Sequence, residues 1–263
     1  MISSDRIPLN TINQREIDFF DNFGDWWSED SELKGLREMN PIRVQYIMEQ
    51  IKNSKPTLIA ENPLFTPLQG LRIADIGCGP GFLTESLSRL GAEVVGLDLG
   101  KTNIAMARAH ANNDPQLKNN LKNGKLVYME ASIETLLEDP RCLGSFDIVC
   151  SMEVLEHVDN PLEFVRLCSS LVKTDGHIFL STINRTFASL FYMILMAEYV
   201  LRLIPIGTHH HRQFINPKRI ISTLTTSQFV IKDLLGLKYN PVTRTWRFDN
   251  DTSVNYILHA IKQ

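Results

Sequence analysis

The chain has 263 residues, of which 43% are hydrophobic and 22% charged, so it is long and apolar enough to bury a substantial core. Its formal net charge of −3 and its pI near 6.2 exclude the strongly basic surface expected of a general nucleic-acid binder. The four cysteines form no Cys-x-x-Cys pair and no zinc-type spacing, which indicates a reducing compartment. We find no secretory signal or acid-poor presequence, so either the protein acts where it is made or a targeting segment precedes this sequence.

Residues 1 to 70 are predicted to form a helical extension that packs on the rest of the chain. Glu16–Phe23 and Arg43–Ile51 carry apolar residues at helical spacing, and Pro41 stands near the expected start of the second helix. The segment Ser54–Gly70 contains three prolines and is typical of a linker.

Residues 71 to 263 alternate between strand and helix patterns and are predicted to form the second domain. The expected strands are Leu71–Ile76, Glu93–Leu97, Leu126–Met129, Phe146–Met152, His177–Ile183, Phe229–Leu235 and Val254–Ile261, the last of them as an edge strand. Helices are expected from Phe82, over Asn103–Ala111 and over Pro161–Val172. This alternation predicts an α/β fold of the Rossmann-like type, with a mainly parallel seven-stranded sheet covered by helices on both faces.

A glycine-rich turn follows the first predicted strand and carries the most specific local signal. Asp75-Ile-Gly-Cys-Gly-Pro-Gly81 leads directly into a helix, and Gly77, Gly79 and Gly81 let backbone N–H groups approach a ligand closely. Phe82 occupies the place of the third glycine of a dinucleotide-binding motif. Asp75 would repel a pyrophosphate but can pair with an ammonium group, which favours S-adenosylmethionine (SAM) over NAD.

A second acidic residue supports this interpretation. Asp98 ends the second predicted strand, 17 residues after Gly81, where its carboxylate is suited to both hydroxyls of a ribose. The glycine turn and Asp98 together predict a SAM site at the carboxyl edge of the sheet.

Two carboxylates and a histidine follow the strand that ends at Met152. In one helical turn, Glu153, Glu156 and His157 would share a face and could bind Mg²⁺, Mn²⁺ or Zn²⁺. The alternative is an exposed acidic turn ahead of the helix that begins at Pro161. The run of histidines at positions 209 to 211 is a further source of one ligand.

An apolar insert is predicted at about residues 185–212. Within Phe187–Ile204, the uncharged stretch Phe187–Ala197 is too short to span a bilayer, and basic residues flank or follow the segment. Such a segment is suited to lie in a membrane interface with anionic lipid, or to form a core helix or a substrate lid.

Several motifs together resemble one known family. They are Phe23-Gly-Asp-Trp-Trp27, Met39-Asn-Pro-Ile-Arg43, Asp75–Gly81, Met152-Glu-Val-Leu-Glu-His157, Ser181-Thr-Ile-Asn-Arg185, Ile204-Pro-Ile-Gly-Thr-His209 and Asn255-Tyr256. With them the chain resembles, over nearly its whole length, the ubiquinone-biosynthesis O-methyltransferases of bacteria and mitochondria, and the mitochondrial type most closely.

The resemblance implies a class I SAM-dependent methyltransferase. It implies that Arg43, Gly77, Asp98 and Met152 line the SAM site, and that Glu153, Glu156 and His157 hold Mg²⁺ or another divalent cation. The implied reaction is metal-assisted methylation of a phenolic oxygen on a polyprenylated dihydroxybenzene. His157 is then a ligand or a catalytic group, and His209 is the other candidate to accept the proton.

The resemblance also implies a place and partners. We expect a peripheral protein on the matrix side of the mitochondrial inner membrane, or in a bacterium one that meets the inner membrane from the cytoplasm. Its expected partners are the polyprenylated phenol or quinol, anionic lipid and other ubiquinone-biosynthesis proteins, with no nucleic acid.

Two other functions remain open at this point. A metal-dependent RNA 2′-O-methyltransferase also uses a Glu-x-x-Glu-His cluster, but it would need a basic groove. A non-catalytic SAM-binding or lipid-binding scaffold is the other alternative, although it would not need the ligand positions to be intact.

Overall fold

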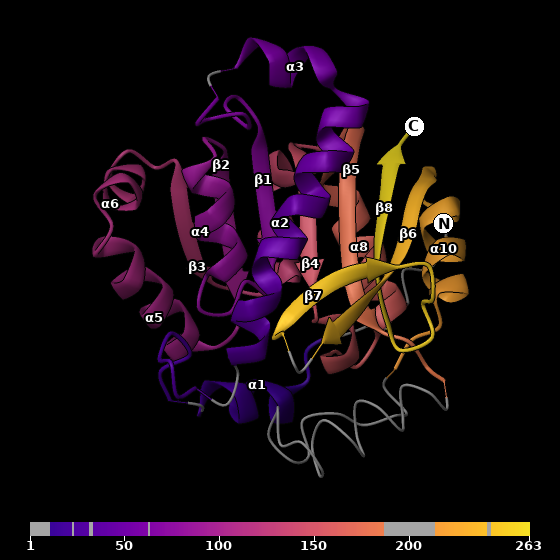
Figure 1. Ribbon diagram of the computed structural model, residues 1–263, viewed down its shortest axis with the longest axis horizontal. Coiled ribbons are helices and arrows are strands. Elements are labelled where there is room, and N and C mark those ends of the chain that lie inside the picture. Colours follow the sequence, from indigo (N-terminus) through magenta and orange to yellow (C-terminus); the bar gives the residue numbers. More distant parts are fainter. Residues whose placement is uncertain (1–10, 23, 32–33, 63, 187–213, 241–242) are drawn as a thin grey trace, which may run out of the picture.

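The computed structural model describes residues 11–22, 24–31, 34–62, 64–186, 214–240 and 243–263. It contains an eight-stranded sheet with helices on both faces (Figure 1). The strands are β1 Arg72–Ile76, β2 Glu93–Asp98, β3 Leu126–Glu130, β4 Phe146–Met152, β5 Val172–Ile183, β6 Phe229–Asn240, β7 Thr245–Asp249 and β8 Asn255–Lys262. The helices are α1 Gln14–Asp21, α2 Lys34–Ser54, α3 Pro56–Glu61, α4 Phe82–Arg89, α5 Lys101–Asn112, α6 Pro115–Lys122, α7 Ile133–Leu137, α8 Pro161–Leu171 and α10 Pro217–Thr226, with 3₁₀ turns at Pro140–Cys142 and Leu155–His157.

The parallel half of the sheet places the site. The strand order is β3-β2-β1-β4-β5-β8-β6-β7, and β1 to β5 run parallel. From β1 the chain proceeds to β2 and β3 on one side and to β4 and β5 on the other, so the order reverses between β1 and β4. In sheets of this kind ligands bind beyond the carboxyl ends of the strands at such a reversal.

The antiparallel half differs from the prediction in two respects. The predicted edge strand, β8, instead lies between β5 and β6, and the side chains of Asn255 to Ala260 are all buried. The prediction of seven strands was one short, because β7 pairs with the end of β6 and forms the edge. This strand, Thr-Trp-Arg-Phe-Asp, is polar at alternate positions and none of its residues is buried, so it lacks the apolar run that indicates a buried strand.

The second N-terminal helix is longer than predicted. It begins at Lys34, and Pro41 lies inside it, because Leu36, Met39 and Ile42 already place apolar side chains on its inner face. Tyr46, together with Ile47 and Ile51, is completely buried in the core that the sheet residues Ile73 and Phe179 also form. The expected linker also contains the short helix α3. The division into residues 1–70 and 71–263 stays a prediction.

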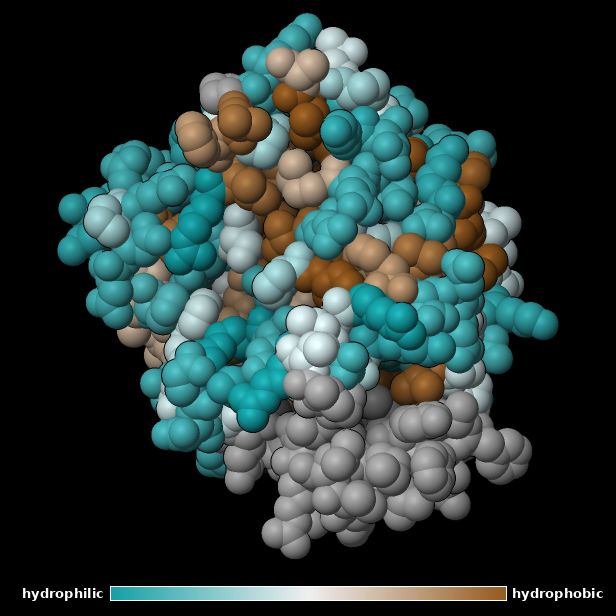
Figure 2. Space-filling view, viewed as in Figure 1, coloured by the Kyte–Doolittle hydropathy of each residue, from teal (hydrophilic) through white to brown (hydrophobic). Residues whose placement is uncertain are grey.

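Helix α1 covers the carboxyl edge of the sheet. In Figure 1 it lies crosswise below the ends of β1 and β4. At its end, an Oδ1 of Asp21 accepts a hydrogen bond of 2.7 Å from the backbone N–H of Thr102, in the first turn of α5. Figure 2, seen from the same side as Figure 1, shows hydrophilic residues over much of the surface in view and apolar residues between α4 and α2.

The predicted insert lies outside the described residues for most of its length, because residues 187–213 are not described. The prediction of a membrane-contacting segment at Phe187–Ile204, and that of a catalytic His209, therefore stay predictions. Among the helices that the structure does describe, none combines the length and the apolar character needed to cross a membrane.

Candidate active site

A cavity of about 1400 Å³ opens at the carboxyl ends of β1, β2 and β4, beneath α1. Most of the residues predicted for the site line it: Arg43, Asp75, Gly77, Gly79, Asp98, Met152, Glu153 and His157. Gly81 and Glu156 are not part of its wall. Residues of α1, of the start of α2 and of the β6–β7 hairpin complete the wall, so the extension and the sheet enclose the same space.

The glycines of the turn have different reasons to be glycine. Gly77 has φ +76°, and a Cβ there would lie 2.4 Å from Cγ2 of Val154, so a side chain would collide with the segment after β4. Gly81 has φ +89°, and its Cβ would lie 2.5 Å from the Tyr128 hydroxyl. Gly81 therefore permits packing under the turn, whereas Gly77 and Gly79 face the cavity.

Asp98 fixes the turn as well as facing the cavity. Its Oδ2 accepts a hydrogen bond of 2.8 Å from the N–H of Gly79, and its Oδ1 accepts one of 2.8 Å from the N–H of Gly100. Burial raises the pKa of this carboxyl above its ordinary value, and the two backbone donors oppose that rise. The ends of β1 and β2 are thereby held together at the place where the sequence predicts a ribose.

Asp75 is a buried carboxyl beside the cavity. It is 2% exposed, and the Thr84 hydroxyl donates to its Oδ2 at 2.5 Å. Burial raises its pKa to about 6, against the opposing effects of the Thr84 hydrogen bond and the Arg43 charge. A cation bound beside Asp75 would favour its ionised form.

Arg43 and Glu153 face each other across the cavity wall. Arg43 comes from α2 and is 5% exposed, and its Nη2 lies 3.7 Å from Oε1 of Glu153. Glu153 has φ +58°, a conformation that few residues other than glycine adopt. The Ser181 hydroxyl donates to the same Oε1 at 2.6 Å. The chain thus turns sharply after β4 and directs Glu153 toward an arginine of the N-terminal extension.

The predicted helical turn over the two glutamates and the histidine is not formed. Because Glu153 is left-handed, it lies before the 3₁₀ turn Leu155–His157 rather than in it, and the three side chains do not share a helical face. Glu156 is 1% exposed and accepts a hydrogen bond of 2.8 Å from the Thr182 hydroxyl. Within the described ranges, no group of three or more His, Cys, Asp or Glu side chains is arranged to hold a metal ion.

His157 instead contacts the N-terminal helix. Its Nδ1 lies 2.9 Å from Oε2 of Glu16, and its ring meets that of Phe20 edge-on, with centroids 4.8 Å apart. Both partners belong to α1 and line the cavity. Nothing in the local sequence pattern around Glu16 connects it with a residue 141 positions later, so the sequence alone does not predict its role.

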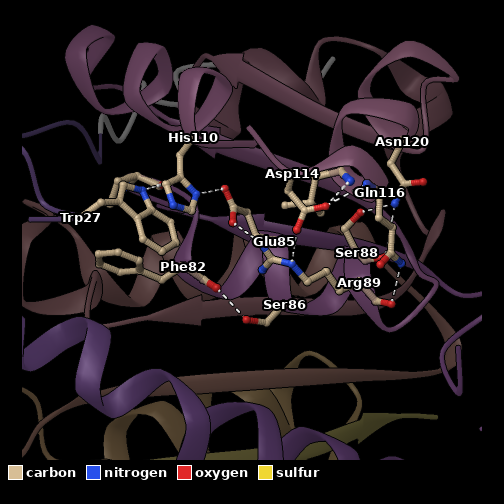
Figure 3. A network of polar contacts seen from close by, with 12 residues as sticks. Trp27, Phe82, Glu85, Ser86, Ser88, Arg89, His110, Asp114, Gln116 and Asn120 are labelled. Atoms are coloured by element: carbon tan, nitrogen blue, oxygen red, sulfur yellow. Dashed lines mark hydrogen bonds and ion pairs between the residues drawn. The ribbon is translucent and has the colours of Figure 1, made fainter. Parts of the chain in front are cut away.

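The tryptophan pair of the N-terminal segment is anchored on both sides. Trp26 lines the cavity and packs with Phe82. Trp27 lies outside it and stacks on His110 of α5, with ring centroids 3.5 Å apart (Figure 3). The Nδ1 of His110 lies 2.8 Å from the buried carboxylate of Glu85. The motif was noted in the sequence without a role, and the structure shows that it attaches the extension to the glycine turn.

Comparisons with known proteins identify the family of the chain. A family model described as a methyltransferase domain matches residues 74–180. The chain is 50% identical to the mitochondrial ubiquinone biosynthesis O-methyltransferase of Dictyostelium discoideum, over 94% of this chain and 77% of that one. It is 37% identical to the ubiquinone biosynthesis O-methyltransferase of Marinobacter nauticus, over 95% of each chain.

Solved structures show the same fold at low identity. The magnesium protoporphyrin IX methyltransferase of Synechocystis with bound S-adenosylhomocysteine (SAH) superposes with a TM-score of 0.57 at 21% identity, covering 88% of this chain and 84% of that one. A SAM-dependent methyltransferase of Thermotoga maritima gives 0.52 at 12% identity, covering 86% and 98%. The fold is that of class I methyltransferases, as predicted. From its relatives, the chain belongs to the ubiquinone biosynthesis O-methyltransferases, which are SAM-dependent enzymes.

Proposed function

We propose that this enzyme transfers the methyl group of SAM to a phenolic oxygen of a polyprenylated dihydroxybenzene, either a catechol-type intermediate or demethylubiquinol. The names of the relatives place the reaction in ubiquinone biosynthesis. The observation that carries the chemical proposal is the contact of 2.9 Å between His157 Nδ1 and Glu16 Oε2 at the wall of the cavity. Neither the RNA methyltransferase nor the scaffold alternative has support from the relatives.

The Glu16–His157 pair is suited to general-base catalysis. A phenol with the tyrosine-like pKa of about 10 is a poor nucleophile near neutral pH, so removal of its proton favours methyl transfer. If Nδ1–H of His157 donates to the Glu16 carboxylate, the ring carries its lone pair on Nε2 and can accept that proton. Glu16 then holds the ring in position and stabilises the imidazolium that forms, as a carboxylate does in other His-carboxylate pairs.

The other predicted residues bind the cofactor in this proposal. Asp75 pairs with the ammonium group of SAM, and the buried guanidinium of Arg43 faces its carboxylate. Gly77 and Gly79 let the backbone approach, and Asp98 and Met152 bound the nucleoside side. The methyl group is then presented to the space near His157, where the phenol is held.

We keep assistance by a divalent cation as a separate proposal. Glu153, Glu156 and His157 supply oxygen and nitrogen donors suited to Mg²⁺, and a bound cation would stabilise a phenolate. In the structure Glu153 contacts Arg43 and Ser181, Glu156 contacts Thr182, and His157 contacts Glu16. As arranged, the three side chains do not fit one ion, so no step is assigned to it.

We also propose that the protein works at a membrane surface. The mitochondrial name of the Dictyostelium relative supports a mitochondrial location. Within it we propose the matrix side of the inner membrane; the bacterial alternative is the cytoplasmic face of the bacterial inner membrane. The apolar sequence Phe187–Ile204 supports contact with anionic lipid. We propose other ubiquinone-biosynthesis proteins as further partners. Flotation with anionic vesicles tests this location when the wild type is compared with a variant in which Phe191, Ile194 and Leu195 are changed to serine.

The acceptor is tested by product analysis. Purified protein is incubated with SAM and a short-chain prenylated catechol, and the product is examined by mass spectrometry and NMR. We expect one new methyl ether on a ring hydroxyl and stoichiometric release of SAH. Methylation on carbon, or turnover of RNA but not of the catechol, would contradict the proposal.

A further inference from the structure

Trp26 is a side chain of the cavity wall to which the reaction assigns no task. It is 6% exposed, and its ring centroid lies 6.0 Å from that of Phe20 and 6.5 Å from that of Phe82. It also lies against the glycine turn, since a Cβ built on Gly79 would be 3.8 Å from its Cζ3. The indole is therefore placed between α1 and the backbone that approaches SAM.

The indole N–H of Trp26 is buried and forms no hydrogen bond with any residue that the structure describes. Native proteins contain few such groups, because a donor that loses its water without gaining an acceptor destabilises the fold. The neighbouring Trp27 shows the usual arrangement, since its N–H donates to the carbonyl of Pro80 at 3.2 Å. The Trp26 donor thus requires an explanation that packing does not give.

A second group on the same cavity wall has the same property. Arg43 is 5% exposed, and its Nε and Nη2 form no hydrogen bond with the described residues. Its nearest anionic atom, Oε1 of Glu153, is 3.7 Å from Nη2, beyond hydrogen-bond distance. Two buried side chains, with three nitrogens that lack acceptors among the described residues, therefore border the space assigned to SAM. Oxygen acceptors of the cofactor, in its carboxylate and its ribose, are their natural partners.

We propose that Trp26 is a SAM-binding residue whose indole N–H donates a hydrogen bond to a cofactor oxygen while its ring packs against the cofactor. The oxygen belongs to the methionine carboxylate or to a ribose hydroxyl. The proposal uses the SAM dependence of the family and does not depend on which phenol is methylated. It adds a second residue of the N-terminal extension, beside Arg43, to the cofactor site, outside the residues 74–180 that the methyltransferase family model matches.

The test measures SAH affinity and stability together. Trp26→Phe keeps an aromatic ring but removes the N–H, so calorimetry should show a Kd for SAH about tenfold higher. The melting temperature of the unliganded variant should stay at or above that of the wild type, because an unpaired donor has been removed. Trp27→Phe removes a donor that has a partner, and its melting temperature should fall by about 2–4 °C.

Trp246→Phe is the matched control for affinity. Trp246 also lines the cavity and its N–H also has no partner among the described residues, but it lies on β7 and not at the glycine turn. Its SAH Kd should stay within about twofold of the wild type, a change of less than about 0.5 kcal/mol. A larger effect at Trp246 than at Trp26 would place the cofactor elsewhere and overturn the proposal.

Binding of 5′-methylthioadenosine, which lacks the amino-acid carboxylate, identifies the acceptor. Loss of the Trp26→Phe effect with this ligand would assign the bond to the carboxylate, and its persistence would assign it to the ribose. Three results would overturn the proposal: an unchanged SAH Kd, a rise only in the KM for the phenol, or a melting temperature lowered as in Trp27→Phe. The last of these would make Trp26 a packing residue.

Discussion

The Nδ1 of His157 lies 2.9 Å from a carboxylate oxygen of Glu16, and this contact joins the segment after β4 to the helix that covers the site. It brings together two residues 141 positions apart, at the wall of the cavity that also contains the glycine turn. The contact gives the N-terminal extension a chemical task, because a carboxylate behind an imidazole determines which ring nitrogen can accept a proton.

Replacement of Glu16 tests that task. Glu16→Gln keeps the shape but removes the charge that stabilises the imidazolium, so we expect kcat to fall by about 10- to 100-fold, with the KM for SAM nearly unchanged. Asp18→Asn makes the same chemical change on the exposed side of α1 and serves as the control. Equal rates for Glu16→Gln and Asp18→Asn would show that the contact only supports α1.

The raised pKa of Asp75 predicts a pH dependence of stability. Because folding raises this pKa from 3.8 to about 6, the folded state binds the proton more tightly, and the resulting stabilisation is present below about pH 4 and lost as the pH rises through 6. At pH 7 the ionised group costs about 3 kcal/mol, so Asp75→Asn should be more stable than the wild type there. Denaturant unfolding at pH 4 to 8 measures the difference, which should disappear at the acidic end.

Asp75→Asn should also bind SAM more weakly at neutral pH, because an asparagine side chain carries no charge to pair with the ammonium group. In the wild type, SAM should release a proton from Asp75 when it binds near pH 6. Calorimetry in buffers of different ionisation enthalpy detects that proton. A pH-independent stability difference would contradict the raised pKa of Asp75, and SAM binding without proton release would place the ammonium group elsewhere.

Gly77 tests the packing of the turn. In Gly77→Ala the new Cβ would lie 2.4 Å from Cγ2 of Val154, and the alanine backbone would have to keep an unfavourable positive φ. We therefore expect the free energy of unfolding to fall by about 2–4 kcal/mol and the affinity for SAH to weaken. Gly124→Ala is matched to it, since φ is +71° there but a Cβ would meet nothing within 4 Å. That control should lose only about 1–2 kcal/mol. Similar losses of stability in Gly77→Ala and Gly124→Ala would show that the contact with Val154 is not what makes Gly77 necessary.

Assistance by a cation is tested with the glutamates. Glu153→Gln combined with Glu156→Gln preserves hydrogen bonding to Ser181 and Thr182 but removes two anionic ligands. If a divalent cation takes part, chelation should abolish most turnover of the wild type, Mg²⁺ should restore it, and the double variant should not respond. Direct Mn²⁺ binding by electron paramagnetic resonance provides the second readout. Full activity after chelation would assign the cluster to structure alone.

Much of the fold could be predicted because periodicity and glycine chemistry are local. The five parallel strands, the glycine turn and the acidic end of β2 all lie where the sequence indicated. The position of β8 inside the sheet depends on pairing between distant segments, which no local pattern records, whereas β7 pairs with the neighbouring β6 but carries no apolar run of its own.

The site was predicted less completely for the same reason. Asp75 and Asp98 lie at the carboxyl ends of β1 and β2 and could be placed, and Arg43 was implied only by the family resemblance. Glu16 and Trp26 acquire meaning only when the extension folds over the sheet. The left-handed Glu153 could not be foreseen, because a helical turn and a 3₁₀ turn after a strand share the same sequence signals.

If His157 takes the proton of a phenolic oxygen as SAM transfers its methyl group, the chemical step must depend on this residue, and single-turnover kinetics measure that step. Enzyme saturated with radiolabelled SAM is mixed with a short-chain prenylated catechol, and the labelled methyl ether is followed by rapid quenching. We predict that His157→Ala slows this step by about 10²–10⁴-fold while the SAH Kd stays within a few-fold. A variant that methylates the catechol at the rate of the wild type would contradict the account.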